Sequence, residues 1–397
     1  MTDFNAMKSK FHLPEGTIYL DGNSLGPLPK ATAARVASVI EEEWGDMLIT
    51  GWNKAGWMAQ PTEIGDRIGR LIGAEKGQVT TGDTLSIKIY QALASALQMR
   101  PERRVVLSDT GNFPSDLYMA QGLLQTLGDD YELRLVEPEG VEDAITDDIA
   151  VLMLTEVDYR TGRLHDMAAL TRKAHAAGAI TVWDLAHTAG ALPVDLAGAG
   201  ADFAAGCTYK YMNAGPGSPA FIYVAPHHAH RALPALSGWL GHEAPFAFEL
   251  DYRAGAGVER MRVGTPPVLQ MAALEVAMEI WDQVDMHALR ARSIELSELF
   301  IAEVEATSPM LTLSSPRDPK ARGSQVSFRF EEGYAAMQAL IARGVVGDFR
   351  APDIMRFGIT PLYLDEEDIR TAARIISDVM NNALWDRDEY KIRAAVT

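Results

Sequence analysis

The sequence predicts an α/β protein with a mostly parallel central sheet in a large domain and a smaller α+β domain. Two observations predict this class. Before residue 265, short apolar runs rich in β-branched residues alternate with amphipathic helical stretches. After Thr265-Pro266-Pro267, long helices and a few short strands replace that alternation. The 397 residues, 47% of them hydrophobic, are enough for both parts to bury a core.

The apolar runs of the first part are expected to form the strands of the sheet. They are Val105–Ser108, Leu133–Val136, Ile149–Leu154, Ala179–Trp183, Phe203–Cys207 and Pro219–Val224. The helical stretches between them are Leu85–Met99, Pro114–Leu127, Val141–Thr146 and Met167–Ala177. Strict alternation of strands and helices favours an open, mostly parallel sheet with helices on both faces.

The second part is expected to form the smaller domain. Its helices are predicted at Val268–Trp281, Met286–Thr307 and Glu366–Leu384, and its strands at Gln325–Phe330 and Met355–Ile359. A helix in the N-terminal segment, at Lys30–Asp46, is expected to join it. We therefore predict a large domain over residues 50–266 and a small domain composed of residues 1–49 and 267–397.

Composition excludes several classes of partner. The chain has 36 basic and 54 acidic side chains, and its net charge of −18 would repel nucleic acid and anionic membrane surfaces. No apolar run approaches the roughly 20 residues that span a bilayer, and the N-terminal stretch lacks the apolar core of a signal peptide. The single cysteine, Cys207, fits a reducing compartment. We expect a cytoplasmic protein.

Two polar residues follow consecutive apolar runs. Asp184 ends one predicted strand, and Lys210 follows the next, so they should lie side by side where ligands bind in open α/β sheets. Alone, each has an ordinary explanation, a helix-capping Asp and an exposed Lys. Together they predict pyridoxal 5′-phosphate, which needs an amine for its aldehyde and a carboxylate for its pyridine nitrogen.

The cofactor's phosphate also needs a site. Thr80-Thr-Gly-Asp-Thr84 precedes a helix that starts near Leu85-Ser86, and free amides and hydroxyls at a helix N-terminus stabilise phosphate. In Gly111–Asp116, Phe113 is placed to stack on the pyridine ring and Asp116 to polarise it. An ordinary proline-initiated helix with an acidic first turn is the alternative for this segment.

Three histidines follow Pro226 in a predicted exposed loop. They are His227, His228 and His230, and a metal site would need matching carboxylates or thiolates beside them. Because the neighbouring sequence offers none, a solvated loop is the favoured interpretation. No metal is predicted.

The chain resembles the kynureninase family, which are fold-type I pyridoxal-phosphate enzymes related to class V aminotransferases. The resemblance covers nearly the whole chain. The segments that carry it are Tyr19–Pro29, Phe113–Asp116, Asp184–His187, Cys207–Tyr211, Gly238–Glu243, Arg262–Pro267 and Arg356–Tyr363. Asn23-Ser-Leu-Gly26 and Gly238-Trp-Leu-Gly-His242 separate this family from its relatives better than the lysine region does.

The resemblance implies roles for individual residues. Lys210, Tyr209 and Asp184 would be catalytic, and Arg356 would bind the substrate's α-carboxylate. The implied cofactor contacts are Leu85, Ser86, Phe113, Pro114, Ser115, Asp116, Thr155, Asp184, His187, Tyr209, Lys210, Trp239 and Thr265. Trp239 and Thr265 would come from the neighbouring subunit, which implies a homodimer with shared active sites. Asn23, Ser24 and Trp52 would lie near the substrate's aromatic end.

The implied reaction is hydrolysis of the Cβ–Cγ bond of L-kynurenine to anthranilate and L-alanine in tryptophan catabolism. The alternative substrate is 3-hydroxy-L-kynurenine, but relatives that prefer it carry histidine at the Trp52 position, so we expect a preference for kynurenine. A class V aminotransferase would need the same Lys, Asp and Arg together with a 2-oxo acid. A second alternative is a cysteine desulfurase, which would need a cysteine on a mobile loop. A third is a non-catalytic binding protein, which would be colourless because it would lack the cofactor.

Overall fold

A seven-stranded sheet forms the centre of the larger lobe in the computed structural model, which describes residues 2–394. Its strands follow the order β4-β10-β9-β8-β7-β5-β6. Only β10 is antiparallel to its neighbours, so the prediction of a mostly parallel sheet is confirmed. The strands are β4 (Val79–Thr81), β5 (Val105–Asp109), β6 (Glu132–Val136), β7 (Ile149–Thr155), β8 (Ile180–Asp184), β9 (Phe203–Gly206) and β10 (Phe221–Val224).

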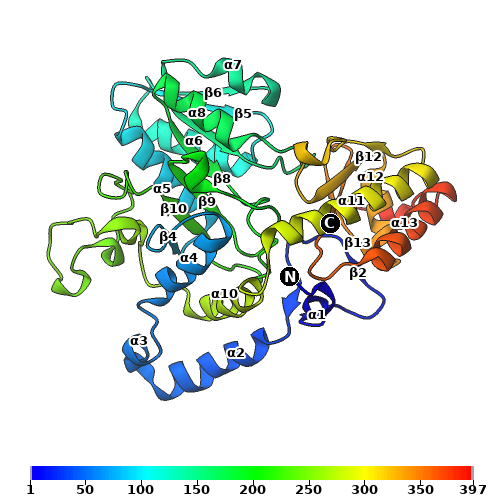
Figure 1. Ribbon diagram of the computed structural model, residues 1–397, viewed down its shortest axis with the longest axis horizontal. Helices are drawn as coiled ribbons and strands as arrows, with labels where there is room; N and C mark the ends of the chain where they lie inside the picture. The colour runs from blue at the N-terminus through cyan, green and yellow to red at the C-terminus, as the bar shows by residue number, and fades with distance from the viewer. Residues whose placement is uncertain (1, 395–397) are drawn as a thin grey trace.

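Helices cover both faces of this sheet (Figure 1). All seven residues of β7 are buried, as expected for a parallel strand between two helical layers. Leu152 and Leu154 belong to the core on one face, and Val151 and Met153 to the core on the other. The helices of this lobe are α4 (Gln60–Leu71), α5 (Leu85–Gln98), α6 (Pro114–Leu127), α7 (Val141–Ala144), α8 (Met167–Ala177), α9 (Leu196–Ala199) and α10 (Val268–Trp281).

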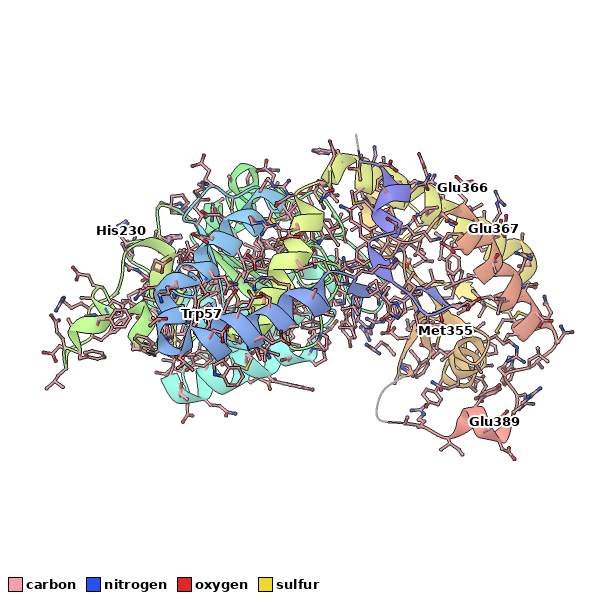
Figure 2. The ribbon with its side chains drawn as sticks, turned by 90° about the horizontal axis from the view of Figure 1, so that it is seen from below. Trp57, His230, Met355, Glu366, Glu367 and Glu389 are labelled. Atoms are coloured by element: carbon pink, nitrogen blue, oxygen red, sulfur yellow. The ribbon has the colours of Figure 1, made fainter. Side chains whose placement is uncertain are left out.

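The smaller lobe contains a four-stranded antiparallel sheet in the order β11-β12-β15-β14. Helix α11 (Met286–Thr307) leads to it from the larger lobe and packs beside α13 (Figure 1). An acidic first turn opens α13, and Glu366 and Glu367 stand at its outer end (Figure 2). The other elements are β11 (Thr312–Leu313), β12 (Gln325–Arg329), α12 (Gly333–Ile341), β13 (Val345–Val346), β14 (Asp348–Arg350), β15 (Ile354–Gly358), α13 (Glu366–Asn381) and α14 (Asp388–Lys391).

The N-terminal segment contacts both lobes. Its β2 pairs in parallel with β13 of the smaller lobe, through Ile18 and Val345. The predicted helix at 30–46 is α2 followed by a π-helical turn, and it packs on α10, where Arg35 binds Glu275 at 2.9 Å. The elements are α1 (Phe4–Lys8), β1 (Phe11–His12), β2 (Ile18–Tyr19), β3 (Leu28–Pro29), α2 (Thr32–Ser38), the π-helical Val39–Asp46 and α3 (Gly51–Lys54).

Most predicted elements are found within a few residues of their expected bounds. The strands β4 and β14 were missed because each has three residues, too few for an alternation to show. Helices α4 and α12 were also not predicted. Within residues 2–394, no helix combines the length and apolar character needed to cross a membrane. The domain division at residues 50 and 266 stays a prediction.

Candidate active site

Lys210 lies in a buried turn just after β9, with 9% of the residue exposed. Its Nζ is 3.4 Å from His187 Nε2 and 5.6 Å from the centre of the Phe113 ring. The Tyr209 ring centre is 5.9 Å away. The amine therefore lies among the Phe113, Tyr209 and His187 rings, at the end of a buried strand.

Asp184 ends β8 at the same edge of the sheet. Its partner across the ladder is Ala205 of β9 on one side and Thr155 of β7 on the other. Asp184 is buried, and its Oδ1 accepts a hydrogen bond from the amide of Ala186 at 2.8 Å. Burial raises the pKa of Asp184, and the charge of Lys210 opposes that rise. The structure thus places Asp184 and Lys210 side by side, as the strand order predicts.

Two further titratable groups complete this pocket. Asp116, in the first turn of α6, is buried, and its Oδ2 has no hydrogen-bond partner. Burial, together with the nearby charge of Asp184, raises the pKa of Asp116 well above its ordinary value. Burial and then the charge of Lys210 lower the pKa of His187 well below its ordinary value, so its imidazole is neutral.

The N-termini of α5 and α6 meet beside this pocket. Thr84 caps α5 by accepting a hydrogen bond from the amide of Ile87, which leaves the first amides of the helix directed outward. Ser86 of α5 and Ser115 of α6 lie with their hydroxyl oxygens 3.0 Å apart. Two helix N-termini with paired hydroxyls form a suitable phosphate site.

Lys88 is a fully buried lysine in the first turn of α5, next to these helix N-termini. Lys88 Nζ donates to Asp83 Oδ2 at 2.9 Å, Gln91 Oε1 at 3.0 Å and the carbonyl of Met261 at 2.9 Å. Asp83 has a φ of 55°, in the left-handed region, at the turn into α5. Lys88 therefore fixes the turn that sets the direction of the helix N-terminus.

Phe113 and Tyr209 lie beside Lys210, and Thr155 pairs with Asp184 in the sheet. Phe113 is the N-cap of α6 and packs edge-on against Tyr159, with ring centres 5.2 Å apart. Thr155 is buried at the end of β7. Burial raises the pKa of Tyr209, so its phenol holds its proton at neutral pH.

Arg356 of β15 enters the site from the smaller lobe. Its Nε donates to Asp348 Oδ1 at 2.5 Å, and its Nη2 donates to the other carboxylate oxygen and, at 3.0 Å, to Ser24 Oγ. Its Nη1 donates to the carbonyl of Tyr159 at 2.5 Å. Asp348 and Arg356 are directly opposite each other in the β14–β15 ladder. Arg350 Nη2 is also 2.9 Å from Asp348.

The N-terminal segment covers the Lys210 turn. The amide of Gly26 donates to the carbonyl of Tyr209 at 2.8 Å. A Cβ at Gly26 would lie 2.4 Å from the carbonyl oxygen of Lys210, so only glycine allows this approach. Asn23 is fully buried nearby, and its Oδ1 has no partner. This packing brings Asn23 and Ser24 to the pocket from a distant part of the sequence.

Trp52, Trp239 and Thr265 lie elsewhere in the chain's own fold. Trp239 packs against Trp52 and Phe246, with ring centres 6.2 and 5.7 Å apart. Thr265 is exposed just before α10. The segment around residue 250 extends from the edge of the larger lobe (Figure 1). Trp239 and Thr265 are therefore exposed and Trp52 is half-buried, whereas the other predicted site residues gather around Lys210 and Arg356.

Three residues of this site were not predicted from the sequence. Asp348 and Tyr159 hold Arg356, and Glu156 donates its amide to the carbonyl of Asp184 at 3.0 Å. Asp348-Phe-Arg350 lies one short turn before Arg356 in the sequence. From this spacing, a hairpin that pairs Asp348 with Arg356 could have been predicted.

Pyridoxal phosphate fits the residues present. Lys210 supplies an amine, Asp184 supplies a buried carboxylate with one oxygen beyond its bond to Ala186, and the N-termini of α5 and α6 supply the anion site. The unpartnered Asp116 Oδ2 is a further polar atom that a ligand in this pocket would satisfy.

Comparison with known proteins gives the same answer. A family model described as "Kynureninase C-terminal domain" matches residues 289–376. The chain is 49% identical to kynureninase from Burkholderia pseudomallei strain 1106a and 48% identical to kynureninase from Pseudomonas fluorescens. Each alignment covers 98% of this chain and 96% of the relative.

Solved structures show the fold. A cysteine desulfurase from Thermococcus onnurineus matches with a TM-score of 0.80 at 18% identity, over 95% of this chain and 98% of that one. A cysteine desulfurase from Escherichia coli matches with a TM-score of 0.80 at 17% identity, over 96% and 99%. At this identity the likeness concerns architecture alone, and it confirms the predicted fold-type I class.

Proposed function

The chain belongs to the kynureninase family, and from this membership we propose that it hydrolyses the Cβ–Cγ bond of L-kynurenine to anthranilate and L-alanine in tryptophan breakdown, with pyridoxal phosphate as its cofactor. The observation that supports the proposal is that Lys210, Asp184 and Arg356 are all buried and that the charges of Lys210 and Arg356 both act on His187, three residues after Asp184. An amino-acid substrate needs all three, because its amine reacts with the cofactor while its carboxylate must be held.

When bound, pyridoxal phosphate draws electrons from the substrate's carbon skeleton and stabilises negative charge at Cα and then at Cβ. Asp184 would accept a hydrogen bond from the pyridine N–H and keep that nitrogen protonated. Leu85, Ser86 and Tyr209 would hold the phosphate, and Phe113 would stack on the ring. Pro114, Ser115, Asp116, Thr155 and His187 would line the remaining contacts.

Lys210 would act twice. Its Nζ would hold the cofactor through the aldehyde carbon, and as a free amine it would take the proton from the substrate's Cα. The neutral His187 at 3.4 Å adds no positive charge that would oppose this proton uptake. At the end of the cycle Lys210 returns a proton to Cα, and L-alanine leaves.

Tyr209 would supply the other proton. Water adds to the substrate's Cγ carbonyl, the Cβ–Cγ bond breaks, and anthranilate departs with Cγ. Cβ then needs a proton. A phenol whose pKa is raised by burial keeps its proton until a strong base such as this carbon forms beside it.

Arg356 would orient the substrate by its α-carboxylate. Its guanidinium plane is fixed by Asp348, Ser24 and the carbonyl of Tyr159, so little side-chain freedom is lost when a carboxylate binds. Asn23 lies between this arginine and the Lys210 turn, where the substrate's aromatic end would pass.

We also propose a homodimer with shared active sites. Trp57, Trp52, Trp239, Phe246 and Phe248 form a chain of edge-on aromatic contacts, here called the aromatic surface. Phe246 and Phe248 are largely exposed, and large exposed apolar patches are typical of protein interfaces. Because Trp52 contacts Trp239 within one chain, both would enter the partner's site together. Thr265 would do the same.

The cytoplasm is the proposed compartment, and residues 50–266 the proposed cofactor-binding domain, with 1–49 and 267–397 as the small domain. The free Cys207 fits a reducing environment. Cys207 is also buried, and burial raises the pKa of its thiol, so it is unsuited to form a persulfide. This separates the chain from the desulfurases that share its fold.

Borohydride reduction followed by peptide mapping tests the site. We expect the reduced cofactor on the peptide that contains Lys210, and we expect Lys210→Ala to abolish both the visible absorbance and release of anthranilate. Lys76→Ala, at an exposed position, is the matched control and should keep both. Cofactor on another lysine, or near-normal turnover in Lys210→Ala, would overturn the assignment.

A further inference from the structure

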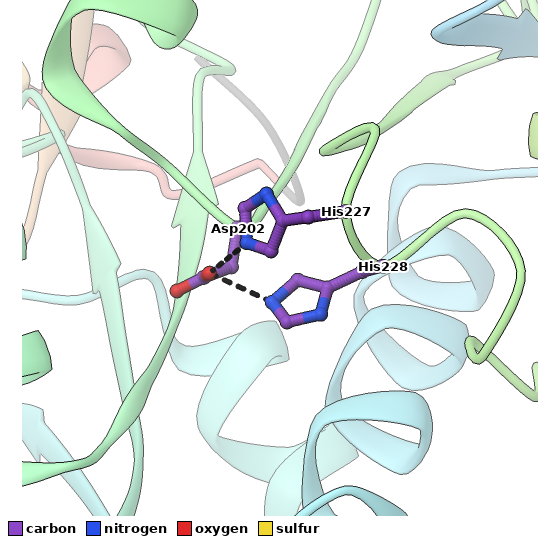
Figure 3. Close-up of side chains that lie close together, drawn as sticks. All are labelled: Asp202, His227 and His228. Atoms are coloured by element: carbon purple, nitrogen blue, oxygen red, sulfur yellow. Dashed lines mark hydrogen bonds and ion pairs between the residues drawn. The ribbon is translucent and has the colours of Figure 1, made fainter.

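A buried carboxylate surrounded by histidines lies at the edge of the central sheet opposite Lys210. Asp202 immediately precedes β9, whose other end leads to Lys210. His227 and His228 follow β10, and antiparallel pairing of Val224 with Phe203 brings them to Asp202 (Figure 3). The expectation of a solvated loop is therefore wrong for His228, which is buried, because its carboxylate partner comes from 26 residues earlier.

The Asp202 carboxylate is held in one orientation. Its Oδ2 accepts hydrogen bonds from the Thr181 amide at 2.8 Å, the Thr181 hydroxyl at 3.0 Å and His175 Nε2 at 2.7 Å. Only 3% of the Asp202 side chain is exposed, and its Oδ1 faces the other two histidines.

His227 and His228 each direct their Nε2 atom toward Asp202 Oδ1. His228 Nε2 is 2.8 Å and His227 Nε2 3.4 Å from Asp202 Oδ1. The His228 side chain is 9% exposed, its ring stacks parallel to Phe203, and its Nδ1 has no partner. The His227 side chain is 60% exposed, so the cluster opens to solvent on that side.

We propose that Asp202 Oδ1, His227 Nε2 and His228 Nε2 bind one divalent transition-metal ion of the Zn²⁺ class. The three ligand atoms already lie within 4.8 Å of one another. An ion at about 2.0–2.2 Å from each would need only small shifts of the rings, and the fourth position would hold water. Imidazole with one carboxylate suits Zn²⁺, Ni²⁺ or Cu²⁺ rather than Mg²⁺ or Ca²⁺.

The surroundings supply outer-shell partners for the carboxylate ligand. His175 and Thr181 fix the ligating carboxylate from its far oxygen, as outer-shell partners do in metal sites. Binding moves the proton of each histidine from Nε2 to Nδ1, and the buried Nδ1 of His228 gains no acceptor, which limits the affinity. The net charge of −18 attracts cations to the chain.

The ion would be structural. It would link the end of α8, the start of β9 and the segment after β10, far along the strand from Lys210. Binding to the folded chain alone raises its stability by mass action. The visible absorbance of the cofactor should therefore stay unchanged when Zn²⁺ is added, while the thermal midpoint rises.

Calorimetric titration of the tag-free, chelator-treated holoenzyme with Zn²⁺ tests the proposal. We expect one ion to bind per chain. The affinity for Zn²⁺ should fall by about 100-fold or more in His227→Ala, which removes a ligand, and by about 10–100-fold in His175→Ala, which removes an outer-shell partner. His230→Ala is the matched control, because His230 lies on the same segment at the outer edge of the lobe (Figure 2) and should leave binding unchanged.

His227→Ala should fold normally, since its side chain is mostly exposed, and its cofactor spectrum provides the check. Absence of stoichiometric binding in the wild type would overturn the proposal. Equal affinity in wild type and His227→Ala, or equal loss in His230→Ala, would also overturn it. Co²⁺ gives a second readout, because ligation by these residues predicts visible d–d absorption that His227→Ala removes.

Discussion

Glu156 carries a buried carboxyl group directly behind the cofactor site. Its amide donates to the carbonyl of Asp184 at 3.0 Å, while its side chain is buried and Oε2 has no partner. Burial raises the pKa of Glu156 from its ordinary value of 4.5 to about 8, and the Thr188 hydroxyl opposes the rise only in part. We therefore predict that Glu156 is neutral in the folded chain at pH 7.

The consequence for stability follows from proton linkage. Between pH 4.5 and about 8 the folded chain holds a proton that the unfolded chain has lost, so stability falls as pH rises through this window. The contribution is fully present below pH 4.5 and is lost above about pH 8. At 1.36 kcal/mol for each pH unit, the loss is at most about 5 kcal/mol.

Thermal midpoints of the wild type, Glu156→Gln and the control Glu139→Gln, measured from about pH 5 to pH 9, test this prediction. Glutamine stays neutral at every pH. The thermal midpoint of Glu156→Gln should therefore rise by several degrees relative to that of the wild type as the pH increases from about 5 to about 9. Glu139 is exposed, and its variant should follow the wild type. Wild-type and Glu156→Gln curves that stay parallel would show instead that Glu156 is ionised in the folded chain at pH 7.

Three further predictions concern the site. Asp348→Asn should raise KM for kynurenine by about 10–100-fold with a smaller change in kcat, because Arg356 loses a charge-assisted bond worth about 1.5–3 kcal/mol; steady-state kinetics with an unchanged KM would contradict this. Lys88→Met should lower stability by about 2–5 kcal/mol, since the buried Gln91 and Met261 acceptors lose their donor; a thermal midpoint equal to that of the wild type would count against it. Trp52→His should shift the kcat/KM ratio toward 3-hydroxykynurenine by about 10-fold or more, because an imidazole can pair with the added hydroxyl; an unchanged ratio in competition assays would remove Trp52 from the specificity argument.

The sheet, and the position of Asp184 and Lys210 at one of its edges, were predictable from sequence. Asp184 and Lys210 follow two apolar runs that are long enough to identify as strands, and parallel pairing of β8 with β9 then places both residues at one edge. The N-terminus of α5 was predictable because Thr84 is a typical cap. These features depend on local pattern and on one general rule of sheet architecture.

Contacts made across the fold were not predictable in the same way. Asp348 reaches Arg356 through β14, a strand of three residues with no visible alternation. Asp202 meets His228 only because β10 runs antiparallel to β9, whereas the sequence analysis assumed a solvated loop. The predicted neutrality of Glu156 depends on its burial, which a single acidic residue after an apolar run does not reveal.

The reaction itself gives the most direct test. Purified protein is mixed with L-kynurenine in the absence of any 2-oxo acid, and absorbance and fluorescence are followed. We expect loss of the kynurenine band with growth of anthranilate fluorescence and release of one L-alanine for each anthranilate. A yellow protein that leaves kynurenine intact until a 2-oxo acid is added would instead have aminotransferase activity, and the proposed hydrolysis would be wrong.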